Sequence, residues 1–115
     1  MMPEGTIASP EGAMPELRET AQLLREAEHL TPEQRQALAE AAERLADALK
    51  DTSPAEAAQL HEAAVGLMEA VHRQHTPIEE AREGLEKAII AAETRAPVAT
   101  GFARQLIDAL ANLGI

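Results

Sequence analysis

The chain has 115 residues and a formal net charge of −10 at pH 7, with twice as many acidic as basic side chains. This length fits one domain. Phosphate backbones and anionic lipid surfaces repel such a chain, so we expect neither nucleic acid nor a membrane as partner. The sequence has no cysteine and a single aromatic residue, Phe102, which excludes disulfides, thiolate nucleophiles and aromatic platforms for base stacking.

Residues 1–13 contain two prolines, two glycines and no periodic apolar pattern. We expect them to form a disordered N-terminal extension, followed by a single helical domain at 14–115. The composition changes at Met14, which makes Met14-Pro15-Glu16 a candidate for the true start. No basic segment with an apolar core marks a secretory signal, and no window is apolar enough to span a membrane. We therefore expect a cytoplasmic protein.

One sequence device recurs at three expected helix starts: a hydroxyl residue, then proline, then Glu or Gln three residues after the hydroxyl. It is found in Thr31-Pro32-Glu33-Gln34, Ser53-Pro54-Ala55-Glu56 and Thr76-Pro77-Ile78-Glu79. The hydroxyl can accept from the third helical amide, and the Glu or Gln side chain can return a bond to the cap. Proline at the first helical position loses no helical hydrogen bond. Pro15 and Pro97 mark two further starts with weaker caps.

The predicted helices span about 15–29, 32–50, 54–75, 77–95 and 97–113. Each has apolar residues at three- and four-residue spacing, which is typical of an amphipathic helix. Short connections favour antiparallel neighbours, so the sequence predicts an all-α bundle of about five short amphipathic helices. The alternative at Pro97 is that the last two segments form one kinked helix. No period-two run favours a strand.

The C-terminal helix has the most apolar stripe of the chain. Its members are Val98, Phe102, Leu106, Leu110 and Leu113. Because alanine fills many stripe positions elsewhere, the apolar core is lean, and the helices form either a compact monomer or a homodimer that covers open stripes. We favour the homodimer and predict that this C-terminal stripe binds a second copy or another protein. Changing Leu106 and Leu110 to glutamate should then abolish association.

Two Glu-x-x-His pairs, Glu26 with His29 and Glu69 with His72, match the spacing that di-iron bundle proteins use. At about 100° per residue, both pairs point away from the neighbouring leucines and toward water. We therefore predict no metal and no cofactor, and keep a carboxylate/histidine metal-binding bundle as the alternative function. His72 is also well placed to stabilise the C-terminal end of its helix, as is His75. His61 lies at the edge of its stripe.

No catalytic residue is predicted, because the chain has no Gly-x-Ser-x-Gly motif and no glycine-rich phosphate loop. Gly66 and Gly84 lie inside predicted helices, where each costs about 1 kcal/mol relative to alanine. They mark either close helix crossings or an exposed face that tolerates glycine. The leading function is therefore a non-enzymatic protein–protein interaction or structural module. Another hypothesis is an acidic regulator that masks a basic surface.

Three stretches resemble a family of short bacterial helical proteins of unknown function. They are Met14-Pro15-Glu16-Leu17, the Thr31-Pro32-Glu33 cap and the ending Leu110-Ala111-Asn112-Leu113-Gly114-Ile115. Members of that family start with Met-Pro-Glu and close on a Leu-Gly-Ile tail. The resemblance covers 14–50 and 77–115, with the helix at 54–75 as an apparent insertion. It implies a bacterial cytoplasmic helical domain and supplies no activity, cofactor or site residue.

Overall fold

The computed structural model describes residues 16–73 and 78–114. In these ranges the chain forms five α-helices and no strand, which confirms the all-α prediction. The helices are α2 (Leu17–Arg25), α3 (Pro32–Leu49), α4 (Pro54–Arg73), α5 (Ile78–Ala92) and α6 (Pro97–Asn112). The predicted disorder of 1–13, the candidate start at Met14 and the cap at Thr76-Pro77 lie outside the described residues.

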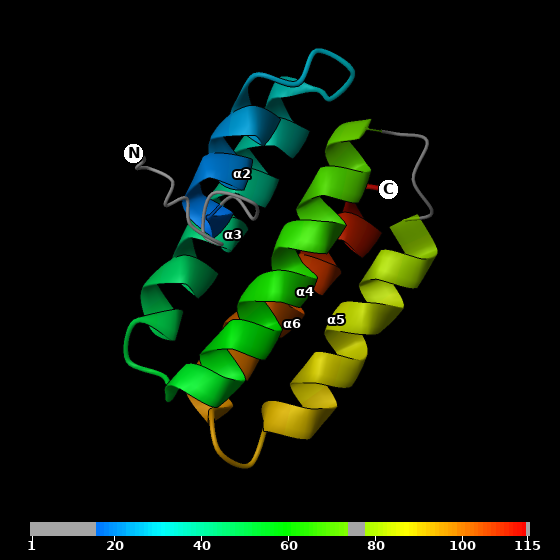
Figure 1. Cartoon of the computed structure of the whole chain (residues 1–115). Coiled ribbons are helices and arrows are strands. Elements are labelled where there is room, and N and C mark those ends of the chain that lie inside the picture. Colours follow the sequence, from blue (N-terminus) through cyan, green and yellow to red (C-terminus); the bar gives the residue numbers. More distant parts are fainter. Residues whose placement is uncertain (1–15, 74–77, 115) are drawn as a thin grey trace, which may run out of the picture.

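The helices form two layers, with α4 at the centre of the front layer between α2 and α5 (Figure 1). Behind them, α3 packs along α2 and α6, and α6 also contacts α5. Helix α5 lies at one edge of the bundle and contacts α4 and α6 alone among the described helices. One long face of α5 is therefore left without a neighbouring helix.

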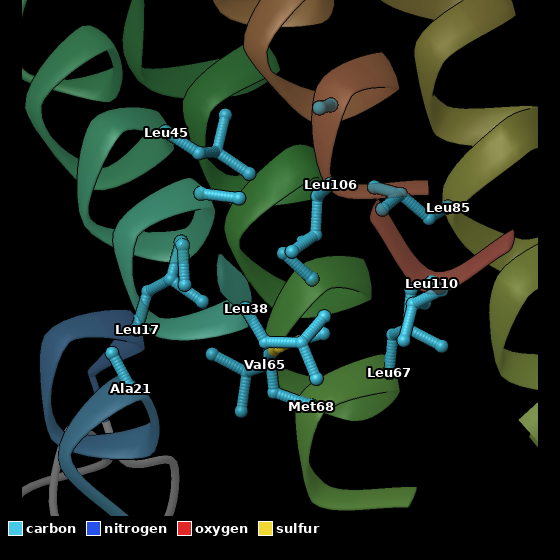
Figure 2. Packing of buried hydrophobic residues seen from close by; sticks show 14 of the residues in the cluster. Leu17, Ala21, Leu38, Leu45, Val65, Leu67, Met68, Leu85, Leu106 and Leu110 are labelled. Carbon is cyan, nitrogen blue, oxygen red and sulfur yellow. The ribbon is translucent and has the colours of Figure 1, made fainter. Parts of the chain in front are cut away.

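The core is built from the leucine stripes that the sequence predicts. Figure 2 shows side chains from all five helices converging: Leu17, Ala21, Leu38, Leu45, Val65, Leu67, Met68, Leu85, Leu106 and Leu110. Many further buried positions are alanine, which lets helix backbones approach closely. The buried hydroxyls of Thr20 and Thr100 donate to carbonyls of the preceding helical turn, at Glu16 and Ala96. No polar partner from outside the helix is needed at either position.

The break before Pro97 separates two helices, so the alternative of one kinked helix is wrong. Helix α5 ends at Ala92, and the chain turns through residues 93–96 before α6 begins. The Ala96 amide donates to the Ala92 carbonyl at 2.8 Å, which closes the last turn of α5. Proline cannot supply the next helical hydrogen bond, and α6 returns antiparallel to α5 (Figure 1).

The first predicted helix, 15–29, ends four residues too late. Helix α2 ends at Arg25, and residues 26–30 continue as single hydrogen-bonded turns, with the Ala27 amide donating to Leu24 and the Leu30 amide donating to Ala27. Ala27 and Leu30 are nevertheless buried in the core. The apolar period therefore continues past the helix end, because turns can also direct side chains inward.

Gln34 joins the start of α3 to the end of α6. The predicted capping box is present: the Gln34 amide donates to Thr31 Oγ1 at 3.1 Å, and Gln34 Oε1 accepts from the Thr31 amide at 2.9 Å. The other end of the same side chain, Nε2, donates to the Leu113 carbonyl at 3.1 Å. One amide side chain thus caps α3 and satisfies a carbonyl at the C-terminus of α6.

Two substitutions separate these roles. Gln34→Ala removes both bonds and is expected to cost about 1 kcal/mol of unfolding free energy. Gln34→Glu keeps an acceptor for the Thr31 amide but has no donor for the Leu113 carbonyl. Gln34→Glu should therefore lower the unfolding free energy less than Gln34→Ala does. It should speed amide hydrogen exchange at Leu113 and Gly114 and leave exchange at the start of α3 unchanged. Equal exchange in both variants and wild type would show that Gln34 does not hold α6.

Candidate functional site

The five residues predicted as an interaction face do not share one exposed surface. Leu106 and Leu110 are only 0% and 1% exposed and lie in the core of the same chain, while Phe102 and Leu113 are half-buried against it. Val98 is exposed. Leu106 and Leu110 are therefore unavailable to a partner in this structure, because helix packing within the chain covers them. Contact of Val98, Phe102 and Leu113 with a partner stays a prediction.

The described part of the chain exposes three large apolar side chains: Leu23, Ile90 and Val98. Ile90 lines a groove of about 410 Å³ between α5 and α6 together with two other isoleucines. Val98 lines a smaller hollow, of about 260 Å³, whose other residues are alanine, proline and polar residues. Its immediate neighbour in sequence, Ile89, is 3% exposed, whereas Ile90 is 68% exposed. Adjacent helical residues point about 100° apart, so one isoleucine enters the core and the other faces the groove.

The groove has an apolar centre and charged ends. It is lined by Glu86, Ile89, Ile90, Arg104, Ile107 and Asp108. Arg104 Nη2 lies 2.6 Å from Glu93 Oε2, which ties α6 to the turn that follows α5. Among the groove residues of α6, Arg104 is nearest the α5–α6 turn and Asp108 is furthest from it. Among those of α5, Glu86 is furthest from the turn.

Two histidine side chains join α4 to α2 and to the turns that follow α2. The Leu17 amide, at the first residue of α2, donates to His61 Nε2 at 3.1 Å, and His29 Nε2 lies 3.0 Å from the Val71 carbonyl oxygen. The sequence predicts His61 only as an edge residue and His29 as water-facing. His29 is exposed as predicted, yet its ring contacts the α4 backbone. Sequence spacing could not reveal either bond, because the partners are more than 40 positions apart.

The metal-binding alternative has no support in the described ranges. There, no group of three or more His, Asp or Glu side chains lies close enough to hold a metal ion. The Glu-x-x-His pair of α4 is half-buried, and that of the first helical segment is exposed. His29 contributes its Nε2 to the contact with Val71 instead. The prediction for His75 lies outside the described residues.

Glu56 links the start of α4 to the turn between α5 and α6. The Ser53 hydroxyl donates to the Glu56 carboxylate, and Arg95 Nη1 lies 3.5 Å from the other carboxylate oxygen. The Ser53 hydrogen bond, followed by smaller contributions that include the positive charge of Arg95, lowers the pKa of Glu56. Ser53 and Glu56, the hydroxyl and acidic residues of the predicted capping device, are thus joined through their side chains.

The lowered pKa of Glu56 predicts a pH-dependent contribution to stability. A carboxyl whose folded pKa is depressed stabilises the fold above its unfolded pKa, and the contribution is lost as the pH falls through the folded value. Glu56→Gln should therefore reduce the unfolding free energy slightly near pH ~7, and the difference should vanish in acid. Urea titrations across pH measure it. Glu62→Gln, an exposed change on the same helix, is the control. A difference that persists unchanged in acid would contradict the assignment.

No described helix combines the length and the apolar character that crossing a bilayer requires.

No curated protein and no solved structure matches the chain. One protein family does, over residues 50–115, and its description is a domain of unknown function, DUF4404. The matched residues contain α4, α5, α6 and every residue that lines the α5–α6 groove. They include the helix that the resemblance treats as inserted, and they exclude α2 and α3. Since the match covers more than half of the sequence, the chain belongs to the DUF4404 family of unknown function.

Proposed function

We propose that this protein is a non-enzymatic helical module that acts by binding a protein surface in the α5–α6 groove. The observation that carries the proposal is Ile90. It is 68% exposed at the centre of a groove that it shares with Ile89 and Ile107. Single exposed apolar residues are common on proteins, but apolar side chains gathered in a hollow mark binding surfaces.

The chemistry of the groove favours a protein over other partners. Three isoleucines form its centre, and charged residues of both signs surround them. Protein interfaces have this plan, with an apolar centre depleted of charge and a polar rim. A net charge of −10 disfavours nucleic acid and anionic membrane as alternatives. The proposed setting is the bacterial cytoplasm, which the resemblance of the sequence implies.

A photo-crosslinking amino acid in place of Ile90 tests the proposal in cells that produce the full chain. We expect covalent adducts of defined mass from position 90, because a bound partner would cover it. The same amino acid in place of Leu23 or Val98 provides matched controls, since these are the other large apolar residues exposed in the described ranges. Adducts from all three positions alike, or none from position 90, would refute the proposed surface.

Ile90→Glu should prevent this binding without harming the fold. Because the Ile90 side chain is largely in water already, its replacement should change the unfolding free energy by less than about 0.5 kcal/mol. Val98→Glu is the matched control, with the same 68% exposure in a different place on α6. Loss of binding in the Val98 variant and not in the Ile90 variant would move the site to the predicted C-terminal stripe.

A further inference from the structure

We infer that the partner of the α5–α6 groove is a second copy of this chain, related to the first by a two-fold axis that crosses the groove level with position 106 of α6. This inference rests on the proposed function, since it names the occupant of the same groove. Its basis is the distribution of charge along the groove, together with the position of α5 at the edge of the bundle.

The two ends of the groove carry opposite charges. At the end nearer the α5–α6 turn it carries Arg104, and at the other end it carries Glu86 and Asp108. A two-fold axis perpendicular to the helices brings the apolar centres of two copies face to face. The helices of the two copies then run in opposite directions. The basic end of each copy then faces the acidic end of the other. A two-fold interface uses the same patch twice, so this patch is complementary to itself.

The antiparallel register pairs specific residues. With the axis level with position 106 of α6, positions 104 and 108 lie the same distance from it on opposite sides. Arg104 of each copy would therefore lie beside Asp108 of the second copy, with Glu86 nearby. The isoleucines of the two grooves would lie between these charged contacts, near the axis. Burying these apolar side chains would provide the affinity, and the charges would fix the direction.

Arg104 can take part in this pairing without leaving its present partner. Its guanidinium contacts Glu93 through Nη2, and the side chains of both residues are about half exposed. Arginine has five N–H donors in a planar fork, so it can bind one carboxylate within the chain and another across the interface. Glu93 would thereby hold the guanidinium in place for the second copy.

The edge position of α5 leaves room for the second copy. Among the described helices α5 contacts only α4 and α6, so no further described helix packs against it (Figure 1). Helices of 15 and 16 residues are each about 23 Å long, and two of them side by side give a small interface. Small interfaces are typical of weak complexes, so we expect a dissociation constant on the order of micromolar.

Charge exchange between two variants tests the inference. Arg104→Glu alone opposes two acidic groups across both symmetric contacts, and Asp108→Arg alone opposes two basic groups. Both variants should be monomers. When they are mixed, the introduced glutamate meets the introduced arginine at one contact, and the original pair re-forms at the other. Native mass spectrometry and sedimentation at near-physiological salt, from about 1 to about 300 μM chain, should detect a dimer with one copy of each.

The controls keep the outcomes distinct. The wild-type chain and Val98→Glu should both dimerise, Ile90→Glu should not, and circular dichroism should give the same helix content for all. A wild-type chain that stays monomeric throughout, or a mixture that fails to form the mixed dimer, would overturn the two-fold inference. If the crosslinker at position 90 then still captures a different protein, the proposed function holds and only its partner changes. If it captures nothing, both fail.

Discussion

Replacing Leu106 by glutamate is expected to unfold the chain, and not merely to separate it from a partner. Leu106 is fully buried among the leucines of the core (Figure 2). A carboxylate at this position would have no cation or hydrogen-bond donor to pair with, and an uncompensated buried charge costs several kcal/mol. Domains of this size have a total stability of only about 5–15 kcal/mol. The substitution therefore removes a large share of the total.

A graded series makes this prediction quantitative. Leu106→Ala leaves a cavity and should lower the unfolding free energy by about 2–5 kcal/mol. Gln105→Glu changes the exposed neighbouring residue and should alter it by less than about 0.5 kcal/mol. Urea unfolding followed by circular dichroism measures all three variants. A Leu106→Glu protein that melts like wild type would mean that α6 does not pack through this residue.

The same residue shows what periodicity can and cannot predict. The stripe that contains Leu106 was correctly recognised as apolar, because spacing along a helix is a local property. Whether such a stripe faces the core of its own chain or a partner depends on how helices far apart in sequence pack together. Here α3 and α6 pack along each other, although their sequences are separated by α4 and α5. The sequence alone therefore included Leu106 and Leu110 in the interaction face, although the fold buries both in its own core.

Helix starts were predicted more accurately than the candidate site. Helices α3, α4 and α6 begin at Pro32, Pro54 and Pro97, as predicted, because a proline and its preceding cap act within a few residues. The groove, in contrast, arises from the register of α5 against α6. Its one sequence signal was the Ile89-Ile90 pair, because adjacent helical residues point about 100° apart and a helix at the edge of a bundle buries only one side. The structure identifies Ile90 as the outward one.

Replacing the three glycines inside helices by alanine is expected to stabilise the chain. Gly66, Gly84 and Gly101 lie in α4, α5 and α6, and a Cβ added at each would have no heavy atom within 4 Å beyond its own helical backbone. Of the two alternatives for Gly66 and Gly84, close helix crossings are therefore wrong, and the exposed face that tolerates glycine is confirmed. Alanine restricts the unfolded chain and suits a helix better, by about 0.4–1 kcal/mol per site.

The three gains should add, because the sites lie on different helices and share no contact. We expect about 1–3 kcal/mol for the triple variant, which corresponds to roughly 5–20 °C in melting temperature for a domain of this size. Gly114→Ala is the control with the opposite sign, since Gly114 has φ +75° and alanine is strained there. If Gly84→Ala instead lowered the melting temperature, α5 around Gly84 would have to pack more closely against its neighbours than the structure shows. If all three gains appear, the glycines are ordinary solvent-facing positions whose replacement leaves the α5–α6 groove intact. The stabilised triple variant is then the better background in which to make the charge-exchange variants.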